Sequence, residues 1–136
     1  MKNEEIVKDV LAMVRGTLVI DENVKELSKP LSTKNIHIIE PIPGEKDEDI
    51  IRRLLPNRII VTKNPKDFKS HASSYDIGII DVSKLKFIDS TQDAFKNKTV
   101  QMISDAITEF SLWSKRHGFM LTLHENGKHV FKNLTE

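Results

Sequence analysis

The chain has 136 residues, with 21 Lys and Arg against 20 Asp and Glu, a net charge of +1, and no cysteine. This length is typical of one domain, so we expect a single domain over residues 1–136. The balanced charge gives no global signal for a nucleic-acid or membrane partner, and the lack of cysteine excludes disulfides and thiolate chemistry. No apolar run approaches the roughly 20 residues that span a bilayer, and the first residues are acidic where a secretory signal is basic. We therefore expect a soluble cytoplasmic protein without membrane association.

Hydrophobic patterning predicts alternating helices and strands. Short apolar runs rich in β-branched residues predict strands over residues 17–20, 35–39, 58–62 and 77–82. Helical spacing predicts an amphipathic helix over 3–15, a short helix over 23–31 that Pro30 ends, a helix from Asp47 to Pro56, and one turn near Asp67-Phe68. This alternation favours an α/β fold with a mainly parallel central sheet and right-handed crossovers.

The C-terminal part, residues 90–133, is expected to hold the longest helix and a terminal β-hairpin. Ser90 to Asp93 match a capping box, and an apolar stripe runs from Phe95 to Trp113 before stopping near Gly118. This stripe most simply packs in the core, although with the first helix it could form a seam for a dimer.

The hairpin is predicted from Asn126-Gly127, the dipeptide that best fits a two-residue type I′ turn. In that register His124 and His129 become cross-strand neighbours. The sequence offers no third ligand for zinc beside them, so ordinary packing is the favoured interpretation.

Each predicted strand ends in polar chemistry. Asp21 follows the first strand, Glu40 the second, Thr62 to Asn64 the third, and Asp81 the fourth. Because the carboxyl ends of parallel strands share one edge of the sheet, these groups are expected to gather there. That edge is where open α/β sheets usually bind ligands.

Three carboxylates in these positions could hold a divalent cation. Asp21 follows a strand, Asp47 begins a helix, and Asp67 lies just beyond another strand. Mg²⁺ and Mn²⁺ accept hard oxygen ligands and need one or two carboxylates plus phosphate oxygens in an open site. Such an ion supports phosphodiester hydrolysis. The competing interpretation is that these acids cap helices or are solvated at strand ends.

The segment Thr62-Lys-Asn-Pro-Lys-Asp-Phe68 concentrates a hydroxyl, an amide and a carboxylate directly after a buried strand. Thr62 could orient an acid or a phosphate, Asn64 could anchor a water or a carboxylate, and Phe68 would fix the segment to the core. The alternative is that Asn64-Pro65 forms a turn and Asp67 caps a short helix.

Three stretches together resemble PIN-like domains in content, order and spacing: Ile20 to Asn23, Asp47 to Ile50, and Arg58 to Phe68. The resemblance covers roughly residues 17–82 and is nearest to short stand-alone PIN-like proteins of uncharacterised function. It implies a three-layer sandwich around a mainly parallel sheet. Many relatives are Mg²⁺- or Mn²⁺-dependent ribonucleases specific for single-stranded RNA, including toxins of toxin–antitoxin pairs. An antitoxin partner and a homodimer are further implications of the resemblance.

Carried over by position, the matching metal-binding acids are Asp21, Asp47 and Asp67, with Asn64 and Thr62 assisting. Some relatives have Asp at the place of Asn64, and an amide there removes one negative charge from the site. The resemblance therefore leaves two functions open. The first is a metal-dependent ribonuclease. The second is a catalytically weak or inactive module that binds RNA or a protein.

Basic residues surround the motif. Lys63, Lys66 and Lys69 flank Asp67, and Arg52 and Arg53 follow Asp47 on its helix. These side chains could contact RNA phosphates, which gives affinity and salt dependence rather than sequence preference. The competing interpretation is an ordinary solvated face. A phosphoacceptor receiver is disfavoured, because the third strand ends in Thr62, Lys63 and Asn64 rather than in Asp.

Overall fold

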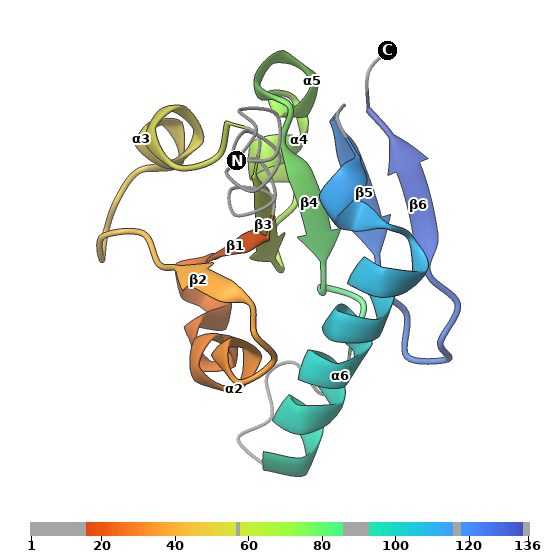
Figure 1. Cartoon of the computed structure of the whole chain (residues 1–136). Coiled ribbons are helices and arrows are strands. Elements are labelled where there is room, and N and C mark those ends of the chain that lie inside the picture. Colours follow the sequence, from red (N-terminus) through yellow and green to blue (C-terminus); the bar gives the residue numbers. More distant parts are fainter. Residues whose placement is uncertain (1–15, 57, 86–92, 116–117, 135–136) are drawn as a thin grey trace, which may run out of the picture.

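The computed structural model describes residues 16–56, 58–85, 93–115 and 118–134, without the side chains of 93–95. The helix predicted over residues 3–15 and the capping box at Ser90 to Asp93 lie outside this part. The described residues form an α/β fold built on one six-stranded sheet in the order β2-β1-β3-β4-β5-β6 (Figure 1). The α/β class and the mainly parallel sheet predicted from the sequence are confirmed.

All strand pairs except the last are parallel, as the alternating pattern predicted. The strands are β1 (Thr17–Ile20), β2 (His37–Ile39), β3 (Ile59–Thr62), β4 (Gly78–Asp81), β5 (Phe119–Thr122) and β6 (Val130–Asn133). Among the described strands only β5 and β6 run antiparallel, so the terminal hairpin is also confirmed. Residues 17–20, 59–62 and 78–81 are buried throughout, as expected for inner parallel strands covered on both faces.

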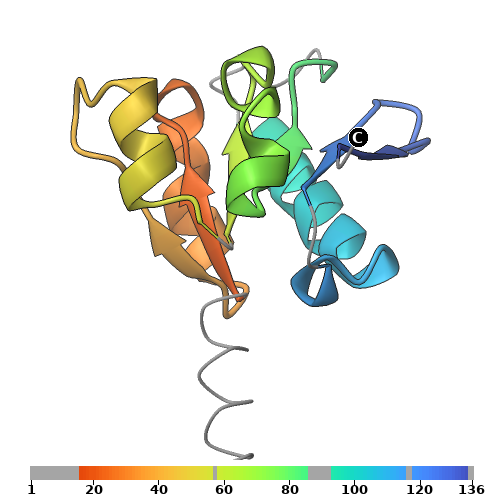
Figure 2. The same cartoon turned by 90° about the horizontal axis from the view of Figure 1, so that it is seen from above.

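Helical segments connect the strands and cover both faces of the sheet (Figure 2). In chain order they are η1 (Glu22–Leu27), α2 (Ser28–Ser32), α3 (Asp47–Arg53), α4 (Lys66–Lys69), α5 (Ala72–Tyr75), α6 (Asp93–Glu109) and η3 (Leu112–Ser114). Sequence patterning predicted the turn of helix at α4 but not α5, whose Ala-Ser-Ser-Tyr stretch has no amphipathic period.

Two hydrophobic cores lie on opposite faces of the sheet. On one face α2 and α6 pack against side chains such as Leu18, Val61 and Leu121. On the other face α3, α4 and α5 pack against side chains such as Val19 and Ile79. Burial of apolar area at roughly 25 cal/mol per Å² makes these two layers the main source of stability.

Pro30 lies inside α2 rather than at its end, which corrects the expected helix boundary. Pro30 is in the first turn, where its missing N–H has no helical acceptor to lose. The helical segment is also bent before it reaches α2, because Val24 has a non-helical backbone (φ −134°).

The long helix ends earlier than its apolar stripe. Its last helical residue is Glu109, and Ser111 adopts a left-handed conformation (φ 51°) before the short η3. Trp113 therefore belongs to η3, and the prediction of one helix to Gly118 is wrong. Met102, Phe110 and Trp113 are partly buried and pack against the core, as the simpler interpretation expected. The dimer seam stays a prediction, because its other half falls on residues 3–15, outside the described residues.

The hairpin turn also differs from the prediction. Thr122 pairs with Val130, so the connection spans residues 123–129 instead of two residues. A type I′ turn needs a left-handed backbone at both central residues, and here only Gly127 has positive φ (82°). His124 and His129 consequently lie in the loop, where His129 Nδ1 accepts a hydrogen bond from the His124 N–H at 3.4 Å.

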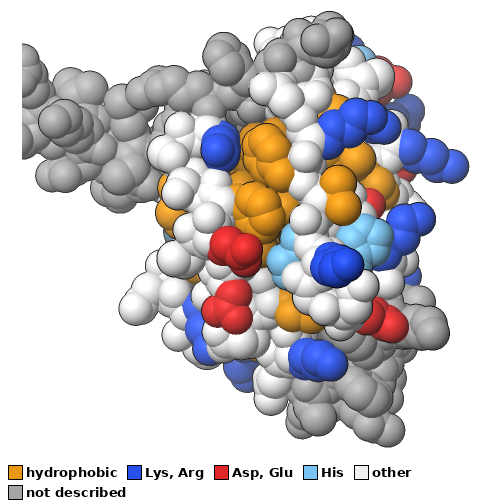
Figure 3. All heavy atoms as spheres, turned by 90° about the vertical axis from the view of Figure 1, so that its right-hand side faces the viewer, with side chains coloured by type: hydrophobic (Ala, Val, Ile, Leu, Met, Phe, Trp, Pro, Cys, Tyr) orange, Lys and Arg blue, Asp and Glu red, His pale blue; other side chains and the backbone are white. Residues whose placement is uncertain are grey.

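An aromatic cluster holds the hairpin against α6. The Phe131 ring stacks on Phe119 and Phe110 with centroid distances of 5.4 and 6.2 Å, and Lys115 Nζ lies 5.1 Å from the Phe131 centroid. Figure 3 shows hydrophobic side chains gathered on the side of the molecule that carries β6, with Lys and Arg around them. Val130 at the start of this edge strand is 54% exposed.

Within the described parts of the chain, no helix combines the length and apolar character needed to cross a membrane.

Gly118 brings α5 close to the start of β5, and this contact generates a prediction. A Cβ at Gly118 would lie 2.6 Å from the carbonyl carbon of Ala72 and 2.7 Å from Ser73 N. Because backbone atoms cannot rotate away, we expect Gly118→Ala to lower the free energy of unfolding by roughly 1–3 kcal/mol. Urea denaturation would measure the change, with Ser73→Ala, an exposed substitution in α5, as the control. Equal stability of the two variants would contradict the close contact.

Candidate functional site

The strand order defines where a ligand is expected. From β1 the sheet extends to β2 on one side and to β3, β4 and β5 on the other. The strands are therefore added on one side of β1 first and then on the other. The position between β1 and β3, where the order of addition changes side, is the switch point of an open α/β sheet. In such sheets ligands bind beyond the carboxyl ends of the strands at the switch point. Asp21 directly follows β1, and Thr62 is the last residue of β3.

A buried hydrogen bond joins the two strand ends. Thr62 Oγ1 donates to Asp21 Oδ2 at 2.7 Å, and the Glu22 N–H donates to Asp21 Oδ1 at 2.8 Å. Asp21 is 8% exposed and Thr62 is fully buried. A buried carboxylate is costly unless it is hydrogen-bonded, so these donors explain how the acid is tolerated. A carboxylate offers about four lone-pair sites, so acceptor capacity remains for a ligand.

A second Asp–Thr pair repeats this arrangement on the neighbouring strands. Asp81 at the end of β4 accepts hydrogen bonds from the Ser83 N–H at 2.9 Å and from Thr122 Oγ1 at 3.3 Å. Asp81 is paired in register with Thr62 on one side and with Thr122 on the other. The sequence predicted that Asp81 lies at a strand end. It did not predict that Asp81 lies beside Thr62, because the order of the strands in the sheet cannot be read from the sequence.

These four side chains share one face of the sheet. The preceding residues Ile20, Val61, Ile80 and Leu121 all belong to the core beneath α2 and α6. Side chains alternate along extended backbone, so Asp21, Thr62, Asp81 and Thr122 point to the face covered by α3, α4 and α5. The two Asp–Thr pairs thus form a row along the edge of the sheet, below the helices that carry the other predicted acids.

Asp47 and Asp67 come from two neighbouring helices. Asp47 begins α3 and Asp67 lies in the first turn of α4, and both residues are exposed. Partial desolvation raises the pKa of Asp47, and the negative charges of Asp67 and Asp21 with a hydrogen bond to Asp67 raise it further. The structure therefore brings together the three carboxylates that the sequence singled out.

The segment after β3 is held at both ends. Thr62 Oγ1 accepts a hydrogen bond from the Asn64 N–H at 2.9 Å, and Phe68 is fully buried, as predicted. Asn64 is exposed at the turn. Asp67 does not cap α4, because Pro65 occupies the N-cap position. The capping interpretation of Asp67 is therefore wrong. Its carboxylate lies in the first turn of α4 and makes no capping hydrogen bond to the helix.

The basic residues that are candidates for RNA contact differ in exposure and in the contacts that they already make. Lys66 and Lys69 are exposed on α4, whereas Lys63 is half-buried and has an interaction of its own. Arg53 forms a two-point ion pair with Glu45, with nitrogen–oxygen distances of 2.9 and 2.6 Å. This contact lowers the pKa of Glu45 and raises that of Arg53. Arg53 thus secures the loop before α3.

No group of three or more His, Asp or Glu side chains is arranged to hold a metal ion in the portion of the chain that the structure describes. The pair His124 and His129 is connected to the backbone of its own loop. His37 is exposed on β2, and its Nδ1 lies 3.2 Å from Thr17 Oγ1, within hydrogen-bonding distance.

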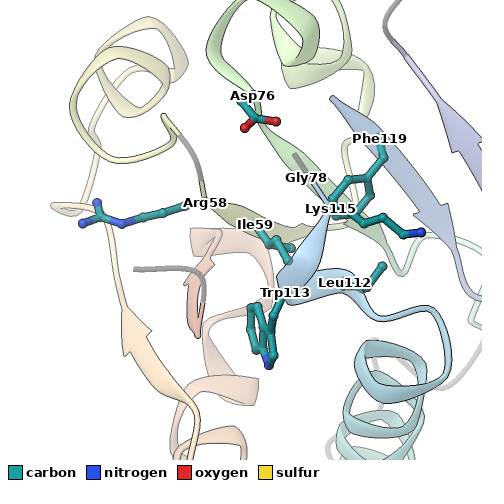
Figure 4. A pocket seen from close by; sticks show the side chains of 8 residues that line it. All are labelled: Arg58, Ile59, Asp76, Gly78, Leu112, Trp113, Lys115 and Phe119. Carbon is teal, nitrogen blue, oxygen red and sulfur yellow. The ribbon is translucent and has the colours of Figure 1, made fainter. Parts of the chain in front are cut away.

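A cavity lies at the amino ends of the strands, away from this site, and it is too small for a ligand. It measures about 10 Å³, room for about one water molecule. Its walls come from the starts of β3, β4 and β5 and from η3, and the Arg58 side chain extends away from the rings of Trp113 and Phe119 (Figure 4). Nothing larger than water fits there.

Comparison with protein-family models, with curated proteins and with solved structures finds no significant match to this chain.

The unequal geometry of the two Asp–Thr pairs generates a stability prediction. Thr62→Val removes the 2.7 Å bond to Asp21 and leaves a buried carboxylate oxygen without its donor. We expect the free energy of unfolding to fall by about 1–3 kcal/mol. Thr122→Val is the matched control, because its bond to Asp81 is longer and only half-buried, so its loss should be smaller. Urea titrations compare the two, and a larger loss for Thr122→Val would contradict the assignment.

The crowding of acids generates a prediction about pH. Because the pKa of Asp47 is raised in the folded chain, ionised Asp47 destabilises the fold. Stability should fall as pH rises from the ordinary value of 3.8 through the raised pKa. Asp47→Asn should therefore raise the thermal midpoint at neutral pH, and this advantage should vanish below about pH 3.8. Calorimetry over this range measures it, with Glu109→Gln on α6 as control. A constant offset between the profiles would contradict the crowding.

Proposed function

We propose that this chain is a PIN-like, metal-dependent ribonuclease that hydrolyses phosphodiester bonds of single-stranded RNA. The observation that carries the proposal is the convergence of Asp21, Asp47 and Asp67 at the switch point of the sheet. The same three acids stand at the motif positions that carry the resemblance to PIN-like domains. A raised acid pKa at a ligand-binding edge is characteristic of functional sites.

The donor set suits a hard divalent cation. Mg²⁺ and Mn²⁺ prefer carboxylate oxygens, and a cation among three carboxylates would relieve the repulsion that raises the pKa of Asp47. Asn23 adds a buried Oδ1 that has no hydrogen-bond partner among the described residues. Since no three acids are already grouped as ligands there, Asp47 and Asp67 would have to adopt other rotamers on binding. Both are exposed, which leaves them the freedom to do so.

The roles of the residues follow from how firmly each is held. Asp21, Asp47 and Asp67 would hold the ion, which when bound polarises a phosphodiester and lowers the pKa of a water. Thr62 keeps the Asp21 carboxylate in one orientation. Asn64 is tied through its N–H to the same hydroxyl, so its exposed amide lies at the rim of the site. Hydrogen-bonded positioning of this kind is what an enzyme needs before substrate binds.

Lys66 and Lys69 would contact RNA phosphates beside the acids, because they are exposed on the helix that carries Asp67. Lys63, on the same segment, would contribute in the same way. Contacts to phosphate give affinity without sequence preference. A small antitoxin as a partner and a homodimeric state belong to the proposal through the resemblance to PIN-like toxins, and they depend on it.

A second function is favoured by one specific observation. Asn64 stands where some PIN-like proteins have Asp, and the described residues hold no preformed group of three metal ligands. A chain with these features could bind RNA or a protein without cleaving it. The two functions differ in whether the acids are needed for a chemical step.

Cleavage of a labelled single-stranded RNA in Mn²⁺, in Mg²⁺ and in excess chelator tests the proposal. We expect cutting with either metal and none with chelator. Asp67→Asn should reduce the rate by at least about 100-fold, since acids that hold a catalytic ion act only together. Asp67 is exposed, so the variant should fold normally.

Asp105→Asn is the matched control, because Asp105 is exposed on α6 at the other face of the sheet. It should cleave like the wild type. Metal-dependent cleavage that survives in Asp67→Asn would argue against this site. RNA binding without cleavage by any variant would favour the second function.

A further inference from the structure

A groove of about 330 Å³ lies between α3 and the α4–α5 segment, lined by Glu48, Ile51, Arg52, His71 and Tyr75. Its volume is within the range of small-molecule sites. Ile51 is buried and belongs to the core beneath the groove, whereas His71 is exposed and Tyr75 is half-buried. The groove therefore has an apolar floor and aromatic and charged walls.

The groove is built from the same segments that carry two of the candidate acids. On α3, Glu48 follows Asp47. On the opposite wall, Asp67 lies in α4, and His71 and Tyr75 belong to the α5 segment that follows it. The Tyr75 N–H donates to the His71 carbonyl at 3.2 Å, so these two residues are one helical turn apart on the same side of α5. The helix that carries Asp47 therefore also forms one wall of the groove, and the segment that follows Asp67 forms the other.

The walls provide the chemistry that a nucleotide requires. The His71 and Tyr75 rings lie 6.4 Å apart at an angle of 50°, so they do not stack flat on each other. Aromatic faces bind nucleobases with little dependence on base identity. Arg52 is 69% exposed, and its 3.7 Å ion pair with Glu48, which is 77% exposed, is too weak to hold it. Its guanidinium can turn to a phosphate.

We propose that this groove binds one nucleotide of single-stranded RNA, with its base against Tyr75 and His71 and its phosphate at Arg52. The inference rests on the proposed function and extends it, because it names the part of the substrate next to the bond that the acids would cleave. Bases in a duplex are already stacked and paired, so the groove selects single strands. Stacking accepts every base, so it gives little sequence preference.

Binding is measured by fluorescence anisotropy with a labelled single-stranded RNA of about 12 nucleotides. Excess chelator is present, so that no cleavage interferes. Tyr75→Ala should weaken binding about 5- to 100-fold, whereas Tyr75→Phe, which keeps the ring, should bind within about twofold of the wild type. A duplex of the same sequence should bind more weakly than the single strand.

Arg52→Gln tests the phosphate contact. It should weaken binding and reduce the slope of log K against log salt by about 0.7, the value for one phosphate of a single strand. Lys29→Gln is the matched control, because Lys29 is exposed on α2 at the opposite face of the sheet. Since Arg52 is exposed, this variant remains decisive even if Tyr75→Ala lowers the thermal midpoint.

Unchanged affinity in both Tyr75→Ala and Arg52→Gln would overturn the inference, as would a wild type that binds no single-stranded RNA. Its failure is distinct from failure of the nuclease proposal. Ring-dependent binding without metal-dependent cleavage would support the groove and refute the ribonuclease. Cleavage lost in Asp67→Asn, together with normal binding by the groove variants, would support the ribonuclease and refute the groove.

Discussion

The hydrogen bond from Thr62 to Asp21 is the interaction on which the edge of the sheet depends. It joins the ends of β1 and β3 at the switch point of the sheet. The same hydroxyl oxygen accepts the Asn64 N–H, so one atom fixes both the buried acid and the loop that leads to Asp67. A buried carboxylate without such a donor would cost more than a typical hydrogen bond contributes. The shape of the loop and the orientation of the Asp21 carboxylate are therefore coupled.

Much of this edge is predictable from sequence because parallel strands obey simple rules. Short β-branched runs ending at Asp21 and Thr62 indicate strands, and parallel strands align their carboxyl ends. This logic is sufficient to bring Asp21, Thr62 and Asp81 to one edge of the sheet. It does not place Asp21 and Asp81 on either side of Thr62, because both neighbourhoods depend on strand order. The convergence of Asp47 on Asp67 likewise depends on the packing of α3 against α4.

The errors in prediction have local physical causes. The apolar stripe of α6 continues beyond the helix because Ser111 turns left-handed and η3 still presents Leu112 to the core. Periodicity detects burial and cannot register such a break. The Asn126-Gly127 turn failed because tertiary pairing of Thr122 with Val130 sets the hairpin register. The α5 segment escaped prediction because its Ala-Ser-Ser-Tyr stretch has no amphipathic period, and periodicity is the signal from which helices are predicted.

The acids of this edge fall into two kinds, and the difference bears on how a ligand would bind. Asp21 and Asp81 are buried, and each of their carboxylate oxygens receives a hydrogen bond, so their positions are set before any ligand arrives. Asp47 and Asp67 are exposed and retain rotamer freedom. A cation would therefore meet one fixed carboxylate, Asp21, and two that must be ordered. Part of its binding free energy would be spent on that ordering. Under the proposed function, metal would therefore bind weakly in the absence of RNA, because substrate phosphate oxygens would supply the ligands that the described side chains leave incomplete.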